Sequence, residues 1–109
     1  MPYSINITLS GELYFRELYE GLQFTYSLEK ANKEVIGILE FTNSLNNNPY
    51  RDASKKQLKH LSDDYRFVLY DITKRNQIKI IFFIEESTKT IHITDFFPCS
   101  MNPNKIMNR

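Results

Sequence analysis

The chain has 109 residues, of which 41% are hydrophobic and 25% charged, values typical of a folded domain that exclude a disordered polymer. Lys and Arg (14) nearly balance Asp and Glu (13), so the formal charge of +1 gives no bulk attraction to nucleic acid. The single cysteine, Cys99, excludes an intrachain disulfide framework and a four-cysteine zinc site. The N-terminal residues lack the basic and apolar stretches of a signal peptide, and no apolar run is long enough to span a bilayer. We therefore expect one cytoplasmic domain over residues 1–109, with no cofactor, no metal and no membrane contact.

The charge is unevenly distributed along the chain. Residues 1–50 hold three basic and six acidic side chains, a net charge of −3, whereas residues 51–79 hold eight basic and four acidic ones, a net charge of +4. A local basic centre can therefore attract an anionic partner although the whole chain is nearly neutral. The alternative is a solvated basic face. The candidate binding residues of this segment are Arg51, Lys55, Lys56 and Lys79.

The first half of the chain has the pattern of a strand followed by two helices. Residues 3–9 alternate between apolar and polar, which predicts a half-buried strand. Ser10 can cap the next helix, whose apolar stripe starts at Leu13 and continues to residue 23 or 26. Residues 25–27 break that pattern and offer a cap for a second helix over residues 28–45, whose stripe starts at Leu28. The short connection predicts an antiparallel hairpin, and Gly37 inside the second helix indicates a close contact or a tolerated weak point.

The second half of the chain has the pattern of three strands, over residues 65–72, 78–85 and 90–97. The separators are short and polar, as in antiparallel hairpins, and Pro98 ends the last strand. The middle strand is apolar on both faces, which favours a central position. Strict alternation places His92 on one face of the last strand with Thr94 and Phe96. The predicted class is α+β, in the order β-α-α-β-β-β, with the helix hairpin packed on a mainly antiparallel sheet that the first strand joins.

Two segments resemble a known family when they are taken with this order of elements. They are Asp-Tyr-Arg-Phe-Val-Leu-Tyr at residues 64–70 and Ile-Thr-Asp-Phe-Phe-Pro-Cys-Ser-Met-Asn-Pro at residues 93–103. Over about residues 3–106 the chain resembles the RelE/ParE superfamily of toxins from type II toxin–antitoxin systems. Two features depart from the family pattern: three residues separate Arg66 from Tyr70 where two are usual, and the turn before Asn102 lacks the arginine that is frequent there.

The resemblance implies a growth-inhibiting toxin of the kind associated with plasmid stabilization. A cognate antitoxin would lie across the helix hairpin and the sheet. The resemblance leaves the oligomeric state open between a homodimer and a hetero-oligomer with the antitoxin.

The RelE branch of this family cuts ribosome-bound mRNA by attack of a ribose 2′-OH on the adjacent phosphate. That reaction needs cations at the phosphate and acid–base groups at the two oxygens. By resemblance, Arg66 and Lys59 would supply the cations, and Tyr70 and His60 are the remaining candidate catalytic residues. In such a nuclease, Arg66 would face the open, concave side of the sheet near Lys59.

Structural interpretations remain open for the same residues. Arg66 can form a cross-strand ion pair with Asp64, Asp71 or Glu85, and Tyr70 can be a core residue with a satisfied hydroxyl. His60 and His92 are acid–base candidates because imidazole titrates near neutrality, or else ordinary polar positions.

Three functions therefore compete. A ParE-like toxin would bind and poison DNA gyrase without being an enzyme, a RelE-like toxin would be an endoribonuclease, and a third form would keep the fold as a non-toxic interaction module. We favour the gyrase poison slightly, because the chain is nearly neutral and the second arginine of the nuclease branch has no counterpart.

Overall fold

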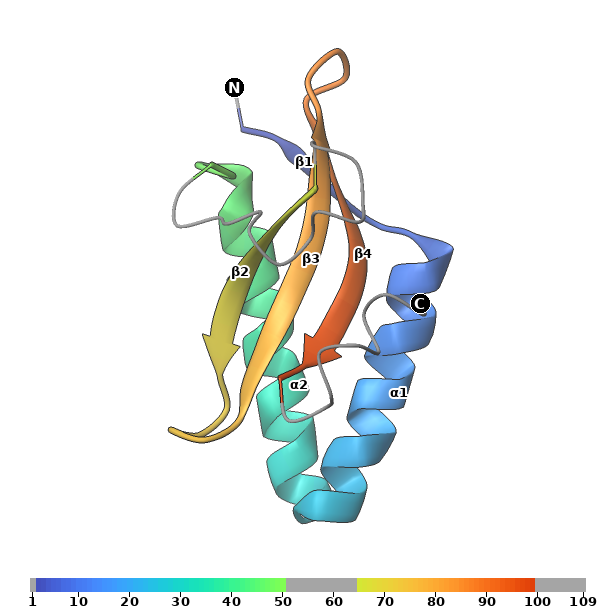
Figure 1. The fold of residues 1–109 in the computed structure, drawn as a ribbon, viewed down its shortest axis with the longest axis vertical. Coiled ribbons are helices and arrows are strands. Elements are labelled where there is room, and N and C mark those ends of the chain that lie inside the picture. The colour runs from blue at the N-terminus through green and yellow to red at the C-terminus, as the bar shows by residue number, and fades with distance from the viewer. Residues whose placement is uncertain (1, 51–64, 100–109) are drawn as a thin grey trace.

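The structure is a computed structural model that describes residues 2–50 and 65–99. A short strand, β1 (Ser4–Ile7), leads into helices α1 (Leu9–Thr25) and α2 (Leu28–Asn43) and a 3-10 turn, η1 (Ser44–Asn46). Strands β2 (Tyr65–Asp71), β3 (Gln77–Glu85) and β4 (Thr90–Pro98) follow (Figure 1). The predicted α+β class and the predicted order of elements are confirmed.

Hydroxyl side chains cap both helices. The Thr8 hydroxyl accepts a hydrogen bond from the Gly11 N–H at 3.0 Å, so α1 begins two residues earlier than the predicted Ser10 cap allows. Because Thr8 is extended and its N–H donates to the Ile93 carbonyl at 3.0 Å, the chain turns into the helix directly at the end of β1. The Ser27 hydroxyl accepts from the Lys30 N–H at 3.1 Å, which confirms the predicted cap of α2.

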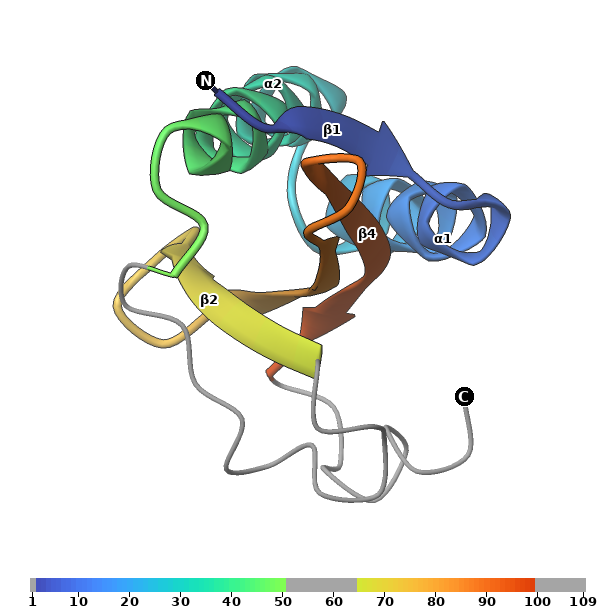
Figure 2. The ribbon, with the colours of Figure 1, turned by 90° about the horizontal axis from the view of Figure 1, so that it is seen from above.

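The sheet has four strands in the order β1-β4-β3-β2. β1 pairs with β4 in parallel, and the β2–β3 and β3–β4 pairs are antiparallel, so β3 is an interior strand as predicted. Figure 2 shows both helices on one side of the sheet.

The main core lies between the helices and the sheet. Leu13 and Leu28, which begin the predicted apolar stripes, are 49% and 60% exposed and lie outside this core. The buried residues of the main core are Leu18, Leu22, Ala31, Ile38, Leu45, Val68, Ile78, Ile80, Phe82, Ile91, Ile93 and Phe96.

A break in register between β3 and β4 corrects the predicted faces of β4. Ile81 pairs with Asp95 and Phe82 pairs with Ile93, so Thr94 is an extra residue and its hydroxyl donates to the Ile81 carbonyl at 3.3 Å. Such a bulge shifts the alternation by one residue. Phe96 therefore packs on the helix side, and His92 lies on the opposite face, so the predicted grouping of these two residues was wrong.

A second, smaller apolar cluster lies on the sheet face opposite the helices. Phe67, Ile81 and Phe97 are buried there, and Tyr65 packs against them. This cluster explains why β3 is apolar on both faces, since its even-numbered residues enter the main core and Ile81 enters this one.

Candidate functional site

Arg66 lies on the helix side of the sheet, near the start of β2. It shares that face with Val68 and Tyr70, which pack in the main core, while Tyr65 and Phe67 point to the opposite face. Arg66 therefore does not take the position on the open side of the sheet that the nuclease alternative requires. Side chains alternate along β2, so Arg66, Val68 and Tyr70 all point to the side of the sheet on which the helices lie.

The guanidinium of Arg66 contacts an aromatic ring. Its Cζ lies 4.9 Å from the centre of the Tyr50 ring, a cation–π arrangement. Within residues 2–50 and 65–99, Arg66 forms no ion pair, so the expected pairs with Asp71 and Glu85 are not formed; Asp64 lies outside the described residues.

The Tyr50 ring belongs to a hydrogen-bond network around Glu86. The Glu86 carboxylate accepts from Tyr50 Oη, from Tyr3 Oη at 2.9 Å and from Lys89 Nζ at 2.8 Å. These bonds, that of Lys89 first, lower the pKa of Glu86 to about 2, and the bond to Glu86 raises the pKa of Tyr50 to about 12. The network joins the N-terminal segment, the segment after η1 and the β3–β4 turn. Sequence spacing did not reveal it because its members are 36 and 83 residues apart.

Tyr70 packs against helix α2. Its ring centre lies 5.5 Å from that of Phe41, and a β-carbon added to Gly37 would lie 2.4 Å from Tyr70 Oη. Burial, followed by the charges of Glu34 and Glu40, raises the pKa of Tyr70. This is the position of a packing residue, and it explains the glycine inside α2 as a close contact.

Lys79 lies on the other side of the sheet from Arg66 and Tyr70. It is 8% exposed, and its Nζ lies 5.0 Å from the centre of the Phe67 ring. The three described candidate residues therefore do not form one site. The remaining candidates, Arg51, Lys55, Lys56, Lys59 and His60, lie outside the described residues.

His92 forms a half-buried histidine–carboxylate pair on the same face as Lys79. Its Nε2 lies 3.1 Å from Glu85 Oε1, its Nδ1 lies 3.0 Å from the amide nitrogen of Asn6, and its ring stacks on Phe83 at 4.7 Å. Because Asn6 Nδ2 can only donate, Nδ1 accepts, and the proton of the neutral imidazole lies on Nε2, which donates to Glu85. Hydrogen bonds from Thr88 and then from His92 lower the pKa of Glu85. Such a pair can exchange a proton with a bound group.

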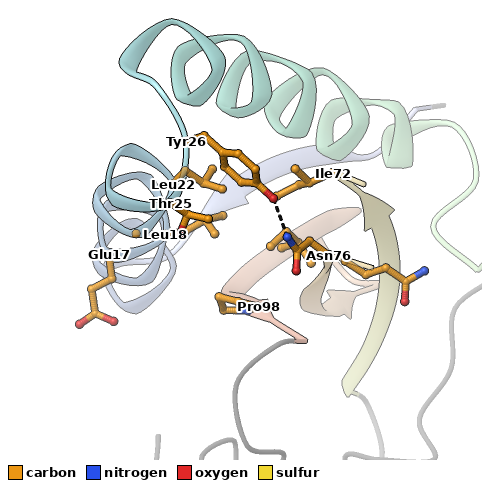
Figure 3. Close-up of a pocket in the computed structure, with 11 residues that line it drawn as sticks. Glu17, Leu18, Leu22, Thr25, Tyr26, Ile72, Asn76 and Pro98 are labelled. Atoms are coloured by element: carbon orange, nitrogen blue, oxygen red, sulfur yellow. Dashed lines mark hydrogen bonds between the residues drawn. The ribbon is translucent and has the colours of Figure 1, made fainter. Parts of the chain in front are cut away.

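A pocket of about 530 Å³ opens between α1, the β2–β3 turn and the end of β4 (Figure 3). Its apolar wall consists of Leu18, Leu22, Ile72, Ile78 and Pro98. On another wall, Asn76 Nδ2 donates a hydrogen bond to Tyr26 Oη, so the two polar groups are paired with each other. Sequence reasoning did not find this pocket, whose lining also includes Gly21 in the middle of α1.

Across residues 2–50 and 65–99, no group of three His, Cys, Asp or Glu side chains is placed to hold a metal ion. Burial raises the pKa of the Cys99 thiol, which disfavours a reactive thiolate. None of the helices in this part of the chain is long and apolar enough to cross a membrane.

Comparison with known proteins identifies the fold. No protein-family model matches the sequence, and no curated protein sequence matches it significantly. Among solved structures, a chain of the toxin–antitoxin complex RelBE2 from Mycobacterium tuberculosis matches with a TM-score of 0.61 and 13% sequence identity. The match covers 89% of this chain and 98% of that chain. The chain therefore has the RelE-like toxin fold that its sequence pattern implied.

Proposed function

We propose that this protein is the toxin of a type II toxin–antitoxin system, a cytoplasmic single-domain protein that inhibits growth until a cognate antitoxin binds it. The observation that carries the proposal is the structural likeness to a chain of the RelBE2 toxin–antitoxin complex over 89% of this chain. The complex also supports an antitoxin partner for this chain, in a hetero-oligomer. Fold alone is a weak guide to chemistry, so the target must be argued from the site.

The site geometry favours a ParE-like gyrase poison. Arg66 contacts the Tyr50 ring on the helix side, Tyr70 packs against Gly37, and Lys79 lies on the opposite face. A nuclease needs its phosphate-binding cations and acid–base groups around one scissile bond, whereas a protein that acts by binding gyrase needs only a complementary surface. The contacts of Arg66 with an aromatic ring and of Tyr70 with helix α2, and the position of Lys79 on the opposite face, therefore support the non-enzymatic mode.

A RelE-like endoribonuclease is the second candidate, and two observations favour it. The solved neighbour is a RelBE2 chain, and the His92–Glu85 pair is a partly exposed acid–base element on the face that also carries Lys79. In that mode, Lys59 and His60, which lie outside the described residues, would complete the set beside His92, because Arg66 lies on the helix side of the sheet.

Controlled expression in a bacterial host separates these possibilities. Growth, covalent gyrase–DNA complexes and the cleavage pattern of ribosome-bound mRNA are measured after induction. We expect growth arrest with trapped gyrase–DNA complexes and intact mRNA. Cleaved mRNA without trapped gyrase would establish the nuclease instead, and normal growth with abundant folded protein would leave the non-toxic interaction module.

A further inference from the structure

Four exposed side chains follow the side of helix α1 that is turned away from the core. They are Leu13, Arg16, Glu20 and Phe24. Their spacing of three or four residues places them along one side of the helix. Leu18, which is buried in the main core, is two residues from both charged positions, roughly 200° round the helix. Figure 2 shows α2 and β4 on the inner side of α1, so the opposite side faces outward.

The outer face of α1 is apolar at its two ends and charged in the middle. Phe24 is 94% exposed and Leu13 is 49% exposed. Between them, Arg16 and Glu20 are both exposed, and in the part of the chain that the structure describes neither forms an ion pair. Both charges are therefore available to a partner, and the exposed apolar side chains at the ends gain from being covered.

The order of side chains on this face (apolar, basic, acidic, apolar) is complementary to itself. Arg16 and Glu20 lie two residues on either side of Leu18, and Leu13 and Phe24 lie five and six residues from it. When two copies of α1 pack antiparallel about a two-fold axis near Leu18, Leu13 faces the Phe24 of the second copy and Arg16 faces its Glu20. Each contact is then made twice. An isologous dimer needs such a surface, because the same patch serves both partners.

We infer that the outer face of α1 is a homodimer interface, in which two chains pack α1 against α1 antiparallel about a two-fold axis near Leu18. The inference goes beyond the proposed function and does not depend on it. The two pairs between Arg16 and Glu20 determine the direction, since parallel packing would place like charges together. One helix face is smaller than a standard interface, so we expect a reversible dimer that is half dissociated at roughly 10–100 µM.

Sedimentation equilibrium of the purified full-length chain measures the dissociation constant of this dimer. Arg16→Glu should weaken the dimer roughly tenfold or more, because it places two acidic side chains opposite each other in both pairs. Adding Glu20→Arg to that variant exchanges the two charges and should restore the constant to within about threefold. Phe24→Ser should also weaken the dimer roughly tenfold or more, since it removes an apolar anchor. The matched controls are Lys33→Glu and Ile36→Ser at exposed positions of α2, which should change the constant by less than about threefold.

Thermal unfolding first establishes that each variant is folded. A wild-type chain that stays monomeric up to roughly 1 mM overturns the interface, whether or not the chain arrests growth. A dimer whose constant is unchanged in both Arg16→Glu and Phe24→Ser also overturns it, because the contact then lies elsewhere on the molecule. A loss in Arg16→Glu that Lys33→Glu reproduces, or that the exchanged pair does not reverse, refutes the antiparallel charge pairing.

Discussion

The contact between Gly37 and Tyr70 predicts a sharp coupling between two substitutions. An alanine at a helix interior is about 1 kcal/mol more favourable than glycine, so Gly37→Ala should stabilise α2 if space allowed. The new β-carbon would lie 2.4 Å from Tyr70 Oη but 3.4 Å from Cζ, an ordinary contact distance. Overpacking of this kind costs about 1–3 kcal/mol, so Gly37→Ala alone should be neutral or destabilising by up to about 2 kcal/mol.

Tyr70→Phe removes the clashing oxygen and leaves the ring in place. In that background, Gly37→Ala should stabilise the protein by about 1 kcal/mol, which is about 4–8 °C in the midpoint of thermal unfolding for a domain of this size. The measurement is the free energy of unfolding in urea for the four members of this double-mutant cycle. Gly21→Ala, where the added β-carbon meets no atom within 4 Å, gives the helix-propensity gain without a contact. The same effect of Gly37→Ala in both backgrounds would refute the contact.

Four further predictions concern stability and activity. Gly11→Ala should destabilise the protein by about 1–3 kcal/mol, since its β-carbon would lie 2.4 Å from the Ile93 carbonyl oxygen, a backbone atom that cannot move aside; urea unfolding measures this loss. The pKa of Glu86 is lowered from 4.5 to about 2, so its stabilisation is present above pH 4.5 and lost as the pH falls toward 2; in Glu86→Gln the melting temperature should depend less on pH in that window. The pKa of Tyr50 is raised from 10.0 to about 12, so its contribution is lost as the pH rises from 10 to 12, and Tyr50→Phe should flatten the alkaline limb. Arg66→Ala should cost at most about 1 kcal/mol and leave growth arrest intact, whereas a loss of roughly 10²-fold in mRNA cleavage would identify a catalytic arginine.

The fold was predictable because the apolar residues of each helix and each strand recur with the period of that element. The helix break at residues 25–27 was visible because Ser27 interrupts an apolar stripe with a capping hydroxyl. The last three strands were visible because short polar turns separate them. The bulge at Thr94 was not predictable, since one extra residue depends on the strand opposite it and leaves no local signal. Leu13 and Leu28 fit a helical stripe, yet both are exposed, because helical spacing alone does not determine which positions of a stripe the sheet covers.

The candidate site was less predictable, because tertiary contacts determine which face a side chain takes and what it meets. The type of Arg66 indicated an anion-binding role, but its face depends on where the helices lie, and its neighbour Tyr50 comes from a distant segment. Glu86 lies in a polar turn with no distinguishing pattern in the sequence. It nevertheless accepts hydrogen bonds from Tyr3, Tyr50 and Lys89. The resemblance located the family pattern in the sequence but not the geometry of these side chains.

The most direct test of the central claim is colony formation by bacteria that carry the chain under a tightly controlled promoter, with and without the adjacent reading frame on a second plasmid. If the chain is an antitoxin-controlled toxin, induction alone should abolish colony formation, and co-expression of the neighbour should restore it while both proteins purify as one complex. Normal colony formation upon induction of soluble, folded protein, with no complex formed by the neighbour, would contradict the account.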